Sequence, residues 1–90
     1  MPTSQVTPLV MPAVPRQFAL VLDENDPDYE EYVRYRQPTN RLVWWGMAFT
    51  DNALLFRPYE DGRLDTARHS DVEAALDRWR RLYPLKVEWL

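Results

Sequence analysis

Hydrophobic and polar residues alternate along much of the chain with the two-residue period of β-strands. The pattern predicts strands over 17–22, 41–50, 53–59, 63–68 and 85–90. Asp51-Asn52 and Asp61-Gly62 are typical of tight hairpin turns, so residues 41–68 are predicted to form an antiparallel meander. The segment 63–68 is the most polar of its three strands, and we expect it at an edge of the sheet.

A three- and four-residue spacing of apolar residues predicts the main helix, over 70–83. Its apolar stripe consists of Val72, Ala75, Leu76, Trp79, Leu82 and Tyr83. Ser70 and Glu73 have the spacing of a capping box, in which each side chain accepts a hydrogen bond from the other residue's backbone N–H. Pro84 then prevents the helix from continuing.

A shorter helix is predicted over 27–36, where Asp26 precedes Pro27 as an N-cap precedes a first-turn proline. Together these elements predict an α+β fold. We expect an antiparallel sheet of four to five strands, with the helix over 70–83 packed on one face. The helix over 27–36 is expected at an end of the sheet or on its other face.

The strand over 41–50 is apolar on both faces. Val43, Trp45, Met47 and Phe49 are expected on one face, with Leu42, Trp44, Gly46 and Ala48 on the other. Gly46 indicates either a β-bulge or the close approach of another element. The helix over 70–83 covers only one face of the sheet. The tryptophan on the other face, either Trp44 or Trp45, must then be covered by the short helix, by the N-terminal segment or by a partner molecule.

Ninety residues allow one domain, which we place at 17–90. Residues 1–16 contain Pro2, Pro8, Pro12 and Pro15, and they are predicted to be an extended or disordered tail. Its apolar side chains would dock on the domain or on a partner, or the segment is simply solvated. Nothing in the chain has the length of a membrane span or the pattern of a signal peptide, so we expect a cytoplasmic protein without membrane contact.

The residues needed for most catalytic chemistry are scarce. The chain has no cysteine, and His69 is its single histidine, expected to be a surface residue at a strand end. The acids between Asp23 and Glu31 lack the glycine turn of a calcium loop, and two glycines cannot build a phosphate-binding loop. We therefore expect no enzyme activity, no metal and no cofactor.

Arginine and aromatic residues are the remaining candidates for function. Tryptophan, tyrosine and arginine are the residue types most enriched at interface hot spots. The candidates of these types are Trp44 of the middle strand and Tyr32, Arg34, Tyr35 and Arg36 of the short helix. The sequence favours a small protein-interaction module, an adaptor, an inhibitor or a small subunit, whose partner is another protein or a second copy. A nucleic-acid accessory protein is the alternative, because arginine and tyrosine also hold phosphates and stack on bases. The nucleic-acid alternative ranks second, because the net charge is −3 and the acids between Asp23 and Glu31 would repel a phosphate backbone.

Overall fold

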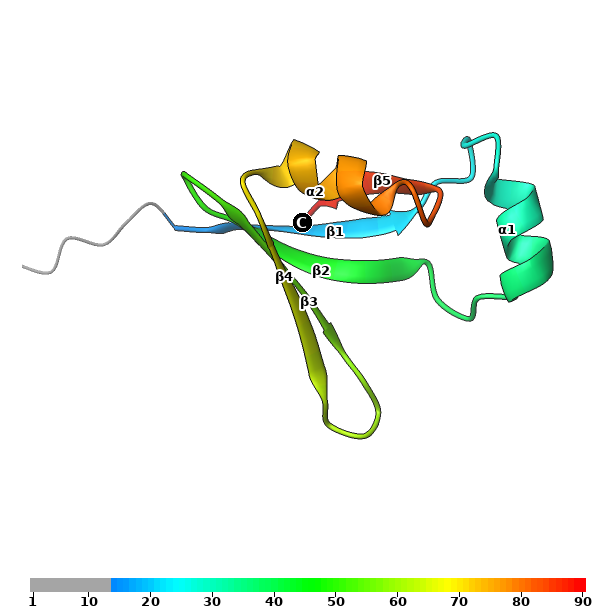
Figure 1. Cartoon of the computed structure of the whole chain (residues 1–90), viewed down its shortest axis with the longest axis horizontal. Helices are drawn as coiled ribbons and strands as arrows, with labels where there is room; N and C mark the ends of the chain where they lie inside the picture. Colours follow the sequence, from blue (N-terminus) through cyan, green and yellow to red (C-terminus); the bar gives the residue numbers. More distant parts are fainter. Residues whose placement is uncertain (1–13) are drawn as a thin grey trace, which may run out of the picture.

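The structure is a computed structural model that describes residues 14–90 (Figure 1). The predicted tail therefore lies, up to residue 13, outside the described residues. Seven elements follow in chain order: β1 (Arg16–Leu22), α1 (Tyr29–Arg36), β2 (Leu42–Ala48), β3 (Ala53–Pro58), β4 (Leu64–His69), α2 (Val72–Trp79) and β5 (Leu85–Trp89). They confirm the predicted α+β fold, with an antiparallel sheet and two helices.

The five strands form one sheet in the order β4-β3-β2-β1-β5. The meander of β2, β3 and β4 is confirmed, and β4 is the edge strand that its polarity predicts. β1 pairs with β2 on one side and with β5 on the other, so the first and last strands of the domain are neighbours. The β3–β4 hairpin extends away from the rest of the sheet (Figure 1).

The helix α2 lies over one face of the sheet and closes the core (Figure 1). Its Ala75 is fully buried, and Val72, Leu76 and Trp79 pack against the same core. β1 contributes the alternate residues Phe18, Leu20 and Leu22 to this core, whereas β2 contributes the adjacent Val43 and Trp44. The large side chains at the centre are Phe18, Leu20, Trp44, Leu55 and Leu85, each no more than 2% exposed.

The predicted start of this helix is wrong by one residue. Asp71, not Ser70, is the N-cap: its backbone is extended and its Oδ1 accepts a hydrogen bond from Ala74 N at 2.7 Å. With Asp71 as the cap, the third helical position is Ala74 rather than Glu73, so the predicted capping box of Ser70 and Glu73 does not form. An acidic cap also suits the positive end of the helix dipole.

The predicted end is also too late, because α2 stops at Trp79. Leu82 N and Tyr83 N both donate to Trp79 O, at 3.0 Å each, in a turn that leads to Pro84. Leu82, which the sequence places on the apolar stripe, is 57% exposed. Tyr83 keeps its predicted contact with the core.

The two hairpins differ in how well the sequence predicts them. Asp61-Gly62 belongs to a three-residue loop in which Gly62 has a φ of 88°, a conformation that favours glycine. At the other hairpin Phe49 N donates to Asn52 O, which centres the turn on Thr50 and Asp51. The predicted Asp51-Asn52 centre is therefore one residue too late.

Gly46 confirms the prediction of a close approach. A Cβ built on this residue would overlap the ring of Phe18, which faces it from β1. The bulge lies three residues earlier: Leu20 pairs with Trp44 and Val21 with Leu42, leaving Val43 as the extra residue of β2. This shift moves Leu42 to the face of Trp45, opposite to the face that strict alternation predicts, while Val43 joins the core.

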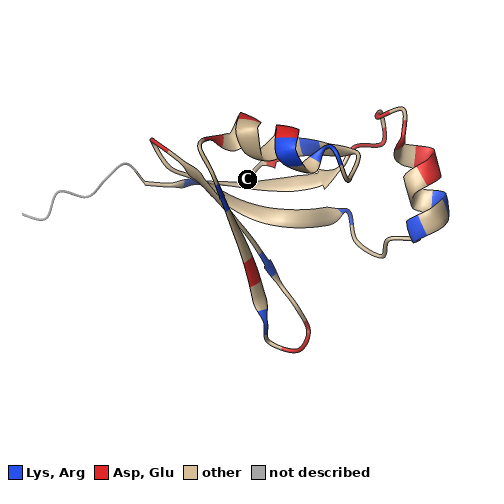
Figure 2. Ribbon diagram, in the orientation of Figure 1, with Lys and Arg blue, Asp and Glu red and all other residues tan. Residues whose placement is uncertain are grey.

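The helix α1 begins at Tyr29, two residues after the predicted start. Asp26 caps the preceding turn instead, because its Oδ1 accepts a hydrogen bond from Asp28 N at 2.8 Å. The helix lies at the end of the sheet (Figure 1) and buries none of its residues completely. Its acids and its arginines separate along the axis, with the acids in the first turn (Figure 2).

Neither described helix is long and apolar enough to cross a membrane.

Candidate functional site

The two adjacent tryptophans of β2 point to opposite faces of the sheet, as predicted. Trp44 lies in the core at 2% exposure, with its ring centroid 4.9 Å from that of Trp79. Trp45 lies on the other face and is 39% exposed. The sequence analysis names Trp44 for an interface, but the core encloses Trp44, and Trp45 is the ring of the pair that another molecule can reach.

The sheet face opposite α2, which we call the open face, is covered by no described helix. Trp45 stands at its centre, stacked at 6.4 Å on Phe56 of β3. Two shallow hollows flank the Trp45 ring. One is lined by Gln17, Met47, Phe56 and Pro58, the other by Ala19, Val21, Leu42, Glu88 and Leu90 together with the loop residues 39–41. The centre of the open face is thus apolar and accessible.

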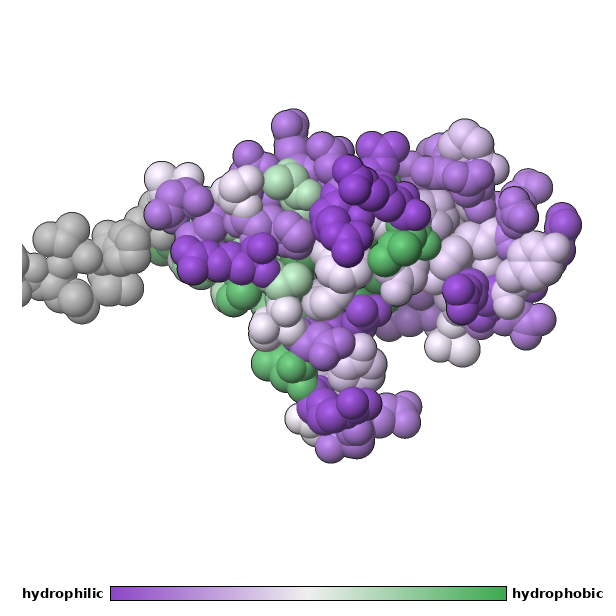
Figure 3. All heavy atoms as spheres, in the orientation of Figure 1, coloured by the Kyte–Doolittle hydropathy of each residue, from purple (hydrophilic) through white to green (hydrophobic). Residues whose placement is uncertain are grey.

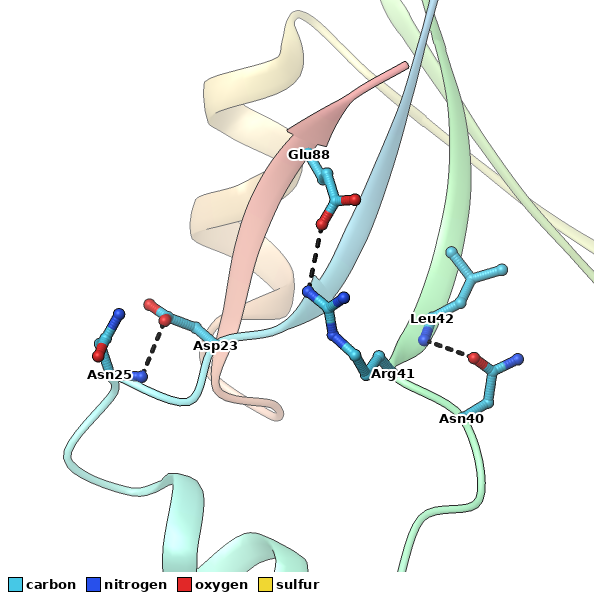
Figure 4. Close-up of polar contacts among 6 residues, drawn as sticks. All are labelled: Asp23, Asn25, Asn40, Arg41, Leu42 and Glu88. Atoms are coloured by element: carbon cyan, nitrogen blue, oxygen red, sulfur yellow. Dashed lines mark hydrogen bonds and ion pairs between the residues drawn. The ribbon is translucent and has the colours of Figure 1, made fainter.

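A charged pair lies beside the second hollow. Arg41 precedes β2 and reaches across β1 to Glu88 of β5, with Nη2 at 3.2 Å from Oε2 (Figure 4). Asn40 Oδ1 accepts a hydrogen bond from Leu42 N at 3.0 Å and orders the approach to the strand. Both members of the ion pair are about half-exposed, so the pair forms a polar margin of the open face.

The other residues predicted for an interface lie on α1 and are partly brought together. Tyr32 is half-buried, and its ring meets that of Tyr83 edge-on, with 5.9 Å between centroids. Tyr35 is 75% exposed, and Arg36 lies near Tyr32. Arg34 is exposed and is not among the residues that line the grooves beside α1 described next.

Two grooves meet beside α1. The first is mixed in charge: Asp26, Asp28 and Glu31 line it together with Arg36, Arg80 and Arg81. The second, which we call the basic groove, has a volume of about 540 Å³. It is lined by Tyr32, Arg36, Pro38, Arg57, Leu82 and Tyr83. These six residues include two arginines and no carboxylate.

Arg57 links the basic groove to the core. Its guanidinium carbon lies 4.3 Å from the centroid of the Trp44 ring, so Trp44 supports Arg57 from below. Sequence reasoning missed Arg57. The signal that could have found it was its place in the alternation of β3. Arg57 falls on the core side with Ala53 and Leu55, where a charged residue is unusual.

His69 is half-buried rather than a simple surface residue. Its Nε2 accepts a hydrogen bond from Trp79 Nε1 at 3.1 Å. Burial lowers the pKa of His69, and the nearby charge of Arg78 lowers it further. Its basic nitrogen is therefore engaged in joining β4 to α2. Residues 14–90 contain no group of three or more metal-ligating side chains.

Comparison of the chain with protein-family models, with curated proteins and with solved structures found no match.

Proposed function

We propose that the chain is a small, non-enzymatic protein-interaction module that binds an apolar segment of a protein partner on its open face. The observation that carries this proposal is the position of Trp45. A large aromatic side chain, 39% exposed, stands at the middle of a five-stranded sheet rather than at its margin. Tryptophan at the centre of a patch is the residue most often found to dominate binding energy.

The surroundings of Trp45 fit a protein partner. Met47, Phe56 and Pro58 give the apolar centre, and Gln17 with the Arg41–Glu88 pair gives a polar margin. An apolar centre with a polar rim is the usual anatomy of a protein–protein interface. The side that carries α2 is different, since mainly hydrophilic atoms cover the helices there (Figure 3).

A non-enzymatic role is supported by the way the single histidine is used. His69 accepts the indole hydrogen bond of Trp79, and burial favours its neutral form. This arrangement serves the packing of α2 on β4. The residues at the open face are aromatic and aliphatic, and such side chains supply contact area rather than acid–base chemistry.

Site-specific photo-crosslinking in the producing cells tests the proposal. Benzoylphenylalanine at Met47, beside Trp45, is expected to give an adduct of one defined mass. The same group at Glu73, exposed in the first turn of α2, is the matched control and is expected to give none. Adding Trp45→Ser to the Met47 variant should abolish the adduct, because the central contact is lost.

The mass of the adduct decides which partner occupies the face. A mass of two chains, with concentration-dependent dimerisation in light scattering, identifies a second copy as the protein partner. A larger or different mass identifies another protein. Equal crosslinking from both positions, or none from Met47, would contradict the proposal.

A further inference from the structure

The basic groove lies on the α2 side of the sheet, away from the open face, and it needs its own explanation. It is formed where α1, β3 and the turn after α2 meet, and Tyr32, Arg57 and Tyr83 represent these three segments. Residues far apart in sequence thus converge on one hollow of about 540 Å³. That volume is in the range of small-molecule sites.

The two arginines of this groove have no acidic partner within the described chain. The ion pairs of residues 14–90 involve Arg41 and Arg63, not Arg36 or Arg57. Arg57 Nε is buried and has no hydrogen-bond acceptor among the described residues. A buried donor of a charged group without an acceptor is costly. The terminal Nη atoms of Arg57 are not among the buried atoms, so they are the donors that a ligand in the groove can reach.

Arg57 is also held in one orientation. Its guanidinium lies over the Trp44 ring at 4.3 Å and within 5.9 Å of the Tyr59 ring centroid. Stacking on an aromatic ring leaves the edge of the guanidinium fork free to donate two parallel hydrogen bonds. A guanidinium that is ordered before binding loses less side-chain entropy when a ligand arrives.

Two phenol groups lie next to the arginines. Burial raises the pKa of Tyr32, and the neighbouring Tyr83 raises it further, so its hydroxyl stays a hydrogen-bond donor. The charges of Arg36 and Arg57 act in the opposite direction on the same pKa, and both arginines line the groove together with Tyr32. The groove therefore gathers two cations and two phenolic donors in one place.

We propose that the basic groove binds a single oxyanion, a carboxylate or a phosphate group, held by the guanidinium groups of Arg36 and Arg57 and by the Tyr32 hydroxyl. Arginine donates bidentately to either anion, and such charge-assisted bonds are the strongest in proteins. The acids Asp26, Asp28 and Glu31 line the adjoining groove and repel a long polyanion. A single anionic group therefore fits this site better than a nucleic-acid backbone.

Titration followed by two-dimensional NMR tests this site in the full chain. Sodium phosphate and sodium acetate are added separately at constant ionic strength, with chloride as the balancing salt. We expect saturable shifts of the Arg57 Nε–H and Trp44 Nε1–H signals, while the Trp45 indole signal on the opposite face does not move. The anion that saturates at the lower concentration identifies the source of the oxyanion.

Three variants separate binding at this site from general attraction of anions. Arg57→Lys keeps the charge but loses the fork, and Arg36→Gln loses the second cation, so each should weaken binding about tenfold or more. Arg34→Gln on the same helix is the matched control and should bind as the wild type does. If Arg57→Lys does not fold, Arg36→Gln still gives the answer.

Non-saturating shifts with both anions, or equal losses in Arg34→Gln and Arg36→Gln, would overturn the proposal. Tighter binding of a single-stranded oligonucleotide that weakens steeply with salt would also overturn it, in favour of a nucleic-acid surface. These results bear only on the α2 side of the sheet, so crosslinking at the open face is judged separately.

Discussion

Gly46 is the residue where the packing leaves least freedom. We expect Gly46→Ala to lower the free energy of unfolding by about 1–3 kcal/mol, because the new Cβ overlaps the buried Phe18 ring. Urea unfolding followed by circular dichroism measures the change. The backbone of β2 cannot easily move to relieve the overlap, because Gly46 is paired with Phe18 on one side and with Leu55 on the other.

A double-mutant cycle with Phe18→Leu isolates this contact. In the Phe18→Leu background, where the side chain is smaller, the alanine should cost clearly less than in the wild type, because the overlapping ring is gone. The same loss in both backgrounds would mean that Gly46 is needed for its backbone and not for its lack of a side chain.

His69 makes stability depend on pH near neutrality. Burial and the Arg78 charge lower the pKa of His69, so the unfolded chain binds this proton at a higher pH than the folded chain does. The stabilising contribution of His69 is therefore complete above its ordinary pKa of 6.5 and is lost as the pH falls through the lowered pKa of the folded state. Protonation also removes the Nε2 acceptor of the Trp79 hydrogen bond.

Comparison with His69→Gln tests this dependence. Between about pH 7.5 and about pH 5.5 the urea midpoint of the wild type should fall more than that of His69→Gln, which does not titrate. Parallel curves for the two proteins would show that another group controls the change.

At the scale of elements, the helix start offers a direct comparison of two candidate caps. Asp71→Ala should destabilise the protein by about 0.5–2 kcal/mol, because Ala74 N loses its acceptor in the first turn of α2. Ser70→Ala should be nearly neutral, since Asp71 is the cap in the structure. Thermal unfolding of both variants measures the difference, and a larger loss for Ser70→Ala would favour the capping box after all.

Most elements could be predicted because their hydrophobic periods are local properties of the sequence. The predictions are wrong where contacts between distant segments determine the local structure. The bulge at Val43 depends on the register between β1 and β2, so it cannot be predicted from the apolar pattern of β2 alone. The early end of α2 leaves Tyr83 free to meet Tyr32 of α1, a contact between segments that are distant in sequence.

At the scale of the whole molecule, the sequence predicts that one of two tryptophans is left without cover, but it names Trp44 for the interface, whereas the structure buries Trp44 and exposes Trp45. Both faces of β2 are apolar, so the choice depends on the side to which α2 folds. The same limit explains why Arg57 was missed, since its value as a site residue depends on Trp44 beneath it and Tyr32 beside it. The aromatic and arginine composition indicates binding, and only the fold separates the open face from the basic groove.

The two tryptophans should therefore differ sharply in what they contribute to folding. Trp44→Ala is expected to cost about 3–5 kcal/mol, because it leaves a cavity beneath Trp79 and removes the support of Arg57. In a domain of this size such a loss leaves much of the protein unfolded. Trp45→Ala should cost clearly less, about 1–2 kcal/mol, since 39% of its surface already contacts solvent.

Urea unfolding of both variants, with Trp45→Phe as the conservative control, measures this asymmetry. If Trp45→Ala destabilises the protein as much as Trp44→Ala does, then Trp45 is part of the structural core, and its presence on the open face needs no partner to explain it. If the asymmetry is found, the chain keeps a large exposed ring at the centre of its sheet that folding does not require. A ring that folding does not need is then free to serve binding, which is the basis of the crosslinking experiment at Met47.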